Sequence, residues 1–198
     1  MKLEFFFDCS SPWTYLGFES LQKLHAAYPD LEVGYKPILV GGVFNQVNPS
    51  VYESRANPVP SKQAYYAKDL QDWANHVGIT IGQPPVFPVN SVKAMRGAFV
   101  AMENKCLVDY ARLVFKTYWT ALQDISDDVV LASIVAEAGM ETSSYFEKIN
   151  LQQYKDRLKN NTEELIERGG FGSPTIFLND VDMYFGNDRF ALIEARLN

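Results

Sequence analysis

The first forty residues alternate between strand-like and helix-like spacing of apolar positions. Residues 3–7 form a short aromatic-rich run, typical of a strand that is buried on both faces. Apolar side chains then recur at helical spacing over residues 13–28, after a Ser11-Pro12 pair suited to begin a helix. Residues 31–35 alternate between apolar and other side chains, as a second strand would. The opening therefore predicts a β–α–β unit whose two strands are parallel neighbours.

The middle of the chain predicts helices joined by loops, without a clear strand pattern. Residues 41–60 are rich in Gly, Asn and Pro, so we expect a loop there. A second loop carries Pro84, Pro85 and Pro88. Helical patterns cover residues 64–77, 90–102, 107–122 and 126–139, and all but the third have a capping residue.

The C-terminal part returns to an alternation of helix and strand. Residues 154–168 predict a helix that ends at a pair of glycines. Residues 176–178 and 183–185 predict a hairpin that turns at Asn179-Asp180. Gly186-Asn187-Asp188 is expected to cap a final helix.

This order of elements is compatible with an α/β fold in which a thioredoxin-like domain is interrupted by an all-helical inserted domain. Residues 1–45 and 155–198 would form the discontinuous thioredoxin-like domain, and residues 46–154 the helical insertion domain.

Composition limits the classes of function. The chain has 198 residues, 47% hydrophobic and 21% charged, which is typical of a globular protein. Its net charge of −6 argues against a nucleic-acid partner, and its apolar runs are shorter than the roughly 20 residues that span a membrane. Cys9 and Cys106 predict neither a disulfide framework nor a metal site. The acid near the N-terminus favours a strand over a signal peptide, so we expect a soluble cytoplasmic protein.

Four segments together resemble the signatures of one family. Residues 8–17 (DCSSPWTYLG) are similar to the opening motif of the 2-hydroxychromene-2-carboxylate isomerases and kappa-class glutathione transferases: an acid, then Ser-Pro-Tyr and a hydroxyl residue. Residues 87–91 (FPVNS) and 94–96 (AMR) resemble its central pattern. Residues 170–175 (GFGSPT) and 185–189 (FGNDR) resemble its two C-terminal signatures. The match spans nearly the whole chain, in the same order.

The resemblance implies a glutathione-binding protein, usually a homodimer, with glutathione held between the two domains. The serine that replaces the redox cysteine of disulfide oxidoreductases maps to Ser11. The residue before the family's cis-proline maps to Ser173, with Pro174 as the proline. The pair that grips the γ-glutamyl end of glutathione maps to Asn187 and Asp188.

Two further residues resemble glutathione-binding positions, and two depart from the family pattern. Asn57 and Lys62 match positions that reach the glutathione backbone and its glycine carboxylate. Trp13 stands where tyrosine is usual, and Cys9 stands where an apolar residue is common.

Ser11 is the predicted catalytic residue. A thiolate is the reactive form of glutathione, and both a hydroxyl donor and a helix N-terminus stabilise such an anion. The alternative is that Ser11 only caps the helix. Asp188 likewise has two possible roles, contact with glutathione and capping of the last helix. Arg96 and Arg189 match the family pattern, but they are also suited to simple ion pairs with acidic side chains.

The predicted function is a glutathione-dependent isomerase resembling 2-hydroxychromene-2-carboxylate isomerase. The alternatives are a kappa-like glutathione transferase acting on other electrophiles or peroxides, a thiol-disulfide oxidoreductase using Cys9, and a binding module without turnover. The oxidoreductase lacks a second cysteine three residues on, where Pro12 stands. The aromatic side chains near the expected site are candidates either for core packing or for walls around an aromatic acceptor: Trp13, Phe44, Tyr52 and Phe87.

Overall fold

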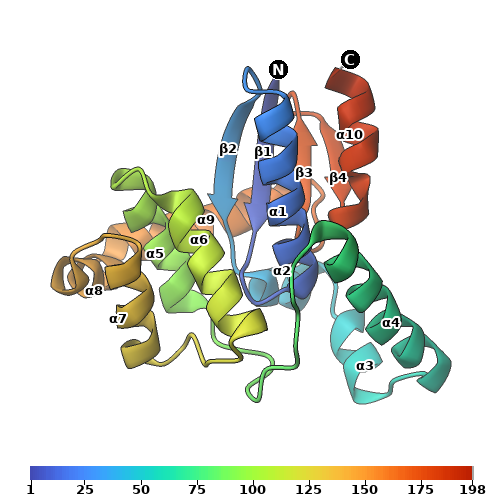
Figure 1. Cartoon of the computed structure of the whole chain (residues 1–198), viewed down its shortest axis with the longest axis horizontal. Coiled ribbons are helices and arrows are strands. Elements are labelled where there is room, and N and C mark those ends of the chain that lie inside the picture. The colour runs from blue at the N-terminus through green and yellow to red at the C-terminus, as the bar shows by residue number, and fades with distance from the viewer. Residues whose placement is uncertain (198) are drawn as a thin grey trace.

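A four-stranded mixed sheet forms the centre of the protein in the computed structural model, which describes residues 1–197 (Figure 1). The strands are β1 (Lys2–Phe7), β2 (Glu32–Pro37), β3 (Thr175–Leu178) and β4 (Asp182–Phe185). Their order across the sheet is β2–β1–β3–β4, with β1 parallel to β2 and antiparallel to β3, and β3 antiparallel to β4. The predicted β–α–β opening, the C-terminal hairpin and the α/β class are confirmed.

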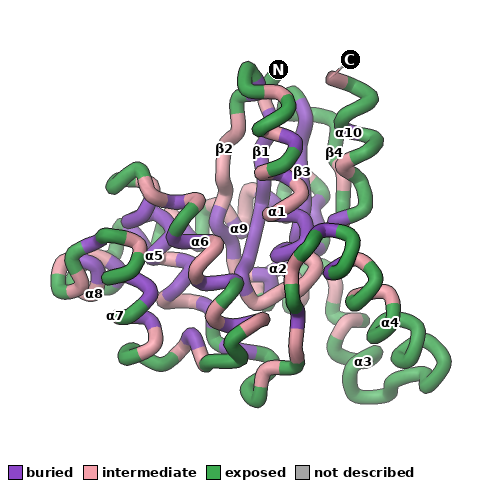
Figure 2. Tube along the Cα trace, viewed as in Figure 1, coloured by how far each residue is buried: buried purple, intermediate pink, exposed green. Residues whose placement is uncertain are grey.

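Strand β1 is buried on both faces because each face of the sheet is covered by helices. Leu3, Phe5 and Phe7 join the large core that includes α1 (Pro12–Ala27). Phe6 points to the other face, in a separate cluster with Phe177 and side chains of α2 and α9. Figure 2 shows this strand as a continuous buried segment through the middle of the molecule. The buried aromatic run was therefore interpreted correctly from the sequence.

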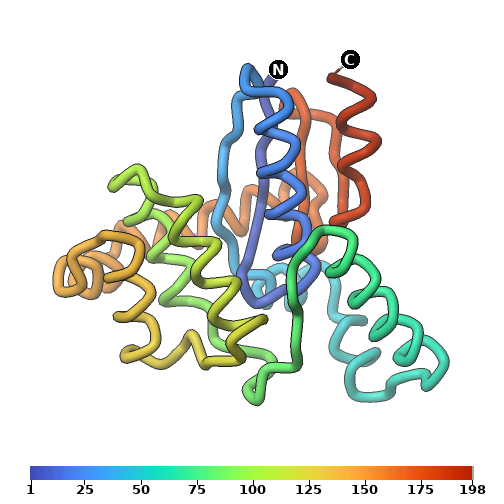
Figure 3. Tube along the Cα trace, in the orientation of Figure 1, coloured from blue at the N-terminus to red at the C-terminus, as the bar shows by residue number. Residues whose placement is uncertain are grey.

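Every regular element between β2 and β3 in the described chain is helical. These elements are α2 (Val40–Val47), α3 (Ser50–Ala56), α4 (Pro60–Val77), α5 (Val92–Glu103), α6 (Leu107–Phe115), a π-helical turn (Lys116–Thr120), α7 (Asp128–Glu137), α8 (Thr142–Asn150) and α9 (Gln152–Glu167). The chain ends in a 3-10 turn (Asn187–Arg189) and α10 (Phe190–Leu197). In the view of Figure 3, helices α5 to α8 gather on the left, while α3 and α4 form an arm on the right. The division of the chain at residues 45/46 and 154/155 stays a prediction.

The prediction of a loop over residues 41–60 is wrong, because this segment contains α2, α3 and the start of α4. The backbone N–H of Val40 donates to Oδ2 of Asp8 at 2.8 Å, which supplies an acceptor to the first turn of α2. Val40 and Val43 are buried on one face of this helix. Helix α3 follows Pro49, which occupies its N-cap position. Helix α2 is therefore stabilised by contacts that its own sequence, with two adjacent glycines, does not reveal.

Three smaller differences separate the predicted and observed helices. Helix α8 was not predicted; it buries Tyr145 and Ile149, four residues apart, and the Glu141 carboxylate accepts hydrogen bonds from its first N–H groups. Helix α7 is capped by Asp127 rather than by Ser126. The helix predicted over residues 107–122 ends in the π-helical turn.

Candidate functional site

Ser11 lies at the N-terminus of α1, as predicted. Its Oγ accepts a hydrogen bond from the Thr14 N–H at 3.3 Å, so the predicted capping role is confirmed. The same hydroxyl donates to the carbonyl oxygen of Ser173 at 3.3 Å, which is long for a hydroxyl donor. The N–H of Trp13 has no hydrogen-bond partner among residues 1–197. A weakly bound hydroxyl, a free N–H and the positive end of the helix dipole therefore converge at this point, an arrangement suited to an anion.

The segment that contains Ser173 and Pro174 lies directly beside Ser11. The peptide bond between these two residues is cis, as the family resemblance implies. Ser173 is only 7% exposed; its Oγ accepts from the Asp8 N–H at 3.1 Å and lies 2.8 Å from Oγ1 of Thr14. A Cβ at Gly17 would lie 3.0 Å from Cγ of Pro174, so α1 approaches this proline closely because it has a glycine there. The Ser173 N–H has no hydrogen-bond partner within the described chain.

The predicted γ-glutamyl pair is tied to the same segment. The Gly186 N–H donates to the carbonyl oxygen of Pro174 at 3.1 Å, and the 3-10 turn that follows packs against α1. Asn187 is 7% exposed, and its Nδ2 is buried without a partner in the part of the chain described here. Asp188 is exposed, with a carboxylate oxygen 3.3 Å from the Arg189 guanidinium. The unpaired amide of Asn187 could donate to a carboxylate, and the exposed carboxylate of Asp188 could accept from an ammonium group. Together they suit a ligand that carries both charged groups of an amino acid.

Asn57 and Lys62 lie apart from this cluster, on the arm formed by α3 and α4. Both are exposed, and neither side chain makes a hydrogen bond or an ion pair with residues 1–197. The arm is attached nearby, because Nδ2 of Asn48 donates to the carbonyl oxygen of Phe171 at 3.1 Å. The structure does not bring Asn57 and Lys62 into contact with Ser11, and their role stays a prediction.

Asp8 is a buried carboxylate beneath the site. Its Oδ1 accepts from the Ser10 N–H at 2.9 Å, and its Oδ2 accepts from the Val40 N–H at 2.8 Å. Burial raises the pKa of this carboxyl, while the two N–H donors oppose the shift. Asp8 therefore joins the segment leading to Ser11 to the start of α2. The motif contained this acid, but its bridging role depends on residues far along the chain.

Cys9 is packed as a buried hydrophobic residue. It is 2% exposed, its N–H points to Sδ of Met95 at 3.4 Å, and its carbonyl accepts from Nε1 of Trp119 at 2.9 Å. Burial, with the Asp8 charge nearby, raises the pKa of the Cys9 thiol well above its ordinary value. The cavity beside it measures about 10 Å³ and is lined by residues such as Phe7 and Met95, so it accepts no substrate. These properties oppose thiolate chemistry at Cys9.

The candidate aromatic walls differ in their exposure. Trp13 is partly buried against the main core. Phe87 is 49% exposed and Tyr52 is 40% exposed, while Phe44 is partly buried. Trp119, which the sequence analysis did not single out, lies with its ring 6.0 Å from that of Phe87. No sequence signal distinguished it from the other core aromatics.

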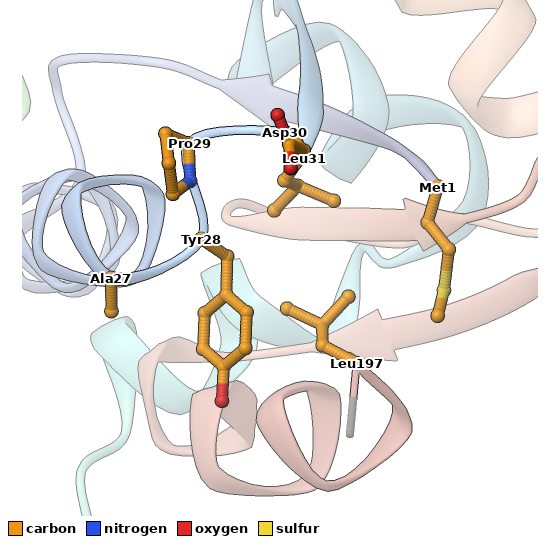
Figure 4. A pocket seen from close by; sticks show the side chains of 7 residues that line it. All are labelled: Met1, Ala27, Tyr28, Pro29, Asp30, Leu31 and Leu197. Atoms are coloured by element: carbon orange, nitrogen blue, oxygen red, sulfur yellow. The ribbon is translucent and has the colours of Figure 1, made fainter.

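A second hollow lies at the C-terminal end of α1, and Figure 4 shows the side chains that line it. It measures about 320 Å³ and is lined by Met1, Ala27, Tyr28, Pro29, Asp30, Leu31 and Leu197. Helix α1 begins just after Ser11 and ends at Ala27, which lines this hollow. About 24 Å of helix therefore separates the hollow from the predicted site. It is therefore distinct from the cluster around Ser11.

Residues 1–197 contain no group of three or more His, Cys, Asp or Glu side chains placed to hold a metal ion. No helix in the same range is long and apolar enough to cross a membrane.

Comparison with known proteins identifies the relatives of this chain. A family model described as a DSBA-like thioredoxin domain matches residues 2–198. The chain is 31% identical to a 2-hydroxychromene-2-carboxylate isomerase of Pseudomonas putida over 204 residues, covering 100% of this chain and 94% of that protein. It is 29% identical to glutathione S-transferase kappa 1 of Homo sapiens over 208 residues, covering 96% and 88%.

A solved structure agrees with these sequence matches. The structure of a selenomethionine 2-hydroxychromene-2-carboxylate isomerase aligns with a TM-score of 0.84 and 27% identity, covering 100% of this chain and 94% of that one. The predicted thioredoxin-like fold class is thereby confirmed. The chain belongs to the DSBA-like thioredoxin domain family, within the group that contains the 2-hydroxychromene-2-carboxylate isomerases and the kappa-class glutathione S-transferases.

Proposed function

We propose that the protein is a glutathione-dependent isomerase that interconverts 2-hydroxychromene-2-carboxylate and trans-o-hydroxybenzylidenepyruvate. The observation that carries the proposal is the position of Ser11, whose hydroxyl lies at the start of α1 and beside the cis-proline segment. The similarity to isomerases supports the reaction class.

The residues around the cis-proline fit a peptide ligand. The free N–H of Ser173 would pair with an extended glutathione backbone as a neighbouring strand would. The orphaned amide of Asn187 and the exposed carboxylate of Asp188 would hold the carboxylate and the ammonium of the γ-glutamyl group. Asn57 and Lys62 would complete the site from the arm, at the glycine end.

Ser11 would stabilise a sulfur anion. Its Oγ already accepts from the Thr14 N–H, so its single proton is free to leave the long bond to Ser173 and point to sulfur. The free Trp13 N–H and the dipole of α1 act in the same direction. Bound glutathione would supply the thiolate that adds to the conjugated acceptor and is eliminated again after bond rotation.

A kappa-like transferase is the second candidate, because the chain is nearly as similar to the human kappa enzyme as to the isomerases. Conjugation of a chloronitrobenzene, or reduction of a hydroperoxide, without isomerisation of the hydroxychromene would support it. An oxidoreductase using Cys9 has little support, because the buried thiol has a raised pKa. If that role were real, Cys9→Ser would abolish insulin reduction by the protein.

We also propose a homodimer in the cytoplasm. Exposed tyrosines on α4, Tyr65 at 60% and Tyr66 at 57%, offer an apolar surface for a second copy. Both cysteines are free thiols, as is usual in a reducing compartment. Sedimentation of wild type and of a Tyr65→Ser, Tyr66→Ser double variant tests the dimer, which the double variant should weaken.

The test of the function combines binding with turnover. Calorimetric titration with glutathione should show saturable binding that Asp188→Ala weakens by about tenfold, because a charge-assisted contact is lost. Asp30→Ala, an exposed acid at the other end of α1, is the matched control. Glutathione-dependent isomerisation of 2-hydroxychromene-2-carboxylate should follow. Absence of glutathione binding at millimolar concentration would reject the proposal.

A further inference from the structure

An exposed arginine on the arm lies over two aromatic rings. The Arg55 guanidinium carbon is 5.7 Å from the ring centroid of Phe44 and 5.3 Å from that of Phe87. Both distances are within the range of a cation–π contact. Arg55 makes no ion pair or hydrogen bond with residues 1–197. Its charge is thus held in place by rings, while its N–H donors stay unpaired.

This aromatic–arginine group, made of Phe44, Tyr52, Arg55 and Phe87, is tied to the segment that carries Ser11. The Phe87 ring lies 6.0 Å from that of Trp119, whose Nε1 donates to the carbonyl of Cys9, two residues before Ser11. Phe44 is on α2, and the first turn of α2 is bound by the Asp8 carboxylate.

The group is also tied to the cis-proline segment. Asn48, which ends α2 and lies seven residues before Arg55, donates to the carbonyl oxygen of Phe171, two residues before Ser173. Tyr52 packs edge-on to Phe44 with centroids 6.2 Å apart, and its hydroxyl donates to Asn45 at 2.9 Å. Helix α2 and the start of α3 therefore hold the group beside both segments of the proposed site.

The chemistry of the group defines its ligand. A guanidinium presents a planar fork of donors that matches a carboxylate, and it retains these donors when its faces stack on rings. Phe87 and Tyr52 are each at least 40% exposed, so they offer ring surface to a planar molecule. A cation without an ion-pair partner among residues 1–197, in a chain of net charge −6, favours an anionic ligand.

We propose that Arg55, with Phe44 and Phe87, forms the acceptor subsite and selects planar aromatic substrates that carry a carboxylate. Arg55 binds the carboxylate and the rings stack on the aromatic part. This inference rests on the proposed function, because it assigns the second substrate of that site.

The test uses two planar ligands of nearly the same size and shape, the anionic 2-naphthoate and the neutral 2-naphthamide. Calorimetry is performed on the glutathione-saturated protein and on the protein alone, with wild type, Arg55→Gln and Phe87→Leu. Arg196→Gln is the matched control, because Arg196 is an exposed arginine on α10.

We expect Arg55→Gln to weaken the binding of naphthoate by about tenfold and that of naphthamide by less than about twofold. Phe87→Leu should weaken both ligands, and Arg196→Gln neither. No binding of naphthoate to wild type, unchanged naphthoate affinity in Arg55→Gln, or equal losses for both ligands would overturn the proposal. A loss confined to glutathione would assign Arg55 to the glycine carboxylate and would overturn it as well.

If the proposed glutathione-dependent function is wrong, the titrations give a result that differs from failure of the Arg55 proposal. Wild-type protein would then fail to bind glutathione, while the titrations without glutathione still measure whether Arg55 distinguishes the charged ligand from the neutral one.

Discussion

The side-chain hydroxyls of Thr14 and Ser173 lie 2.8 Å apart, and both residues are buried. One belongs to the first turn of α1 and the other precedes the cis-proline, 159 residues later. The Ser173 hydroxyl also accepts from the Asp8 N–H, so it is fixed from two sides. This contact sets the orientation of the Ser173 backbone, whose N–H is the proposed partner of glutathione.

Thr14→Val removes one hydroxyl at nearly constant volume. We expect the free energy of unfolding to fall by about 1 kcal/mol, because a buried hydrogen bond is lost. Glutathione affinity should fall several-fold, because the Ser173 backbone is held less firmly. Denaturant unfolding and calorimetry measure the two effects. Thr142→Val is the control, since no hydrogen bond of the Thr142 side chain exists within residues 1–197; wild-type glutathione affinity in Thr14→Val would contradict the prediction.

Ser11→Ala should shift the dependence of turnover on pH. Loss of the hydroxyl donor raises the thiol pKa of bound glutathione by about one to two units, because a hydrogen bond to a charged group is lost. The thiolate is the reactive form, so the rising limb of the pH–rate profile moves to higher pH. Ultraviolet absorbance of the thiolate, followed against pH, gives the pKa directly.

Ser11→Gly distinguishes catalysis from capping. Alanine at an N-cap costs about 1 kcal/mol of stability, whereas glycine costs only a few tenths. Both variants lack the hydroxyl, so both should show the same raised thiol pKa. If Ser11 only capped α1, activity would follow stability and Ser11→Gly would resemble wild type.

The Asp8 carboxyl should make stability depend on pH. Its pKa is raised by burial, so the folded state holds the proton more tightly than the unfolded state. Its contribution to stability is therefore greatest below the ordinary carboxyl pKa of 3.8 and declines as pH rises through the raised value. The stability of Asp8→Asn should not show this decline with rising pH, because the asparagine side chain does not ionise.

The Asp8→Asn variant should be less stable at low pH by about 2 kcal/mol, because its amide nitrogen cannot accept from both Ser10 and Val40. The difference in the free energy of unfolding between wild type and Asp8→Asn should shrink as pH rises, because only wild type is destabilised when the buried carboxyl ionises. Urea unfolding across a pH series measures it. A difference that grew with pH would show that the carboxyl pKa is lowered instead.

The parts of the fold that the sequence predicted are those with local signals. The aromatic run of β1 is buried on both faces, as its composition indicated. Ser11 caps α1 through an N–H three residues away, a contact within one turn. The cis bond before Pro174 followed from the family resemblance, because that signature was intact.

The parts that were missed depend on distant contacts. Helix α2 contains two glycines and has low intrinsic propensity, but Asp8 binds its first turn from 32 residues away. The pairing of Thr14 with Ser173 has no local signature, although Thr14 lay within the opening motif. Arg55 lay in a segment predicted as a loop, and only the folded arm brings it to Phe87.

Gly97 lies in close contact with a pair of buried tyrosines in the helical region. A Cβ at this position would overlap the hydroxyl of Tyr145 and lie 2.5 Å from that of Tyr110. These two hydroxyls are buried and 2.8 Å apart. Gly97→Ala should therefore lower the free energy of unfolding by about 2–3 kcal/mol, since overpacking outweighs the gain in helix propensity.

Gly41→Ala is the matched control, because Gly41 is also a helical glycine, but within residues 1–197 the added Cβ would meet no atom within 4 Å other than those of its chain neighbours and its own helix backbone. It should raise the free energy of unfolding by about 0.5–1 kcal/mol. Denaturant midpoints of the two variants test the contrast. If both substitutions stabilised the protein, the close packing of Gly97 against the tyrosine pair would be contradicted.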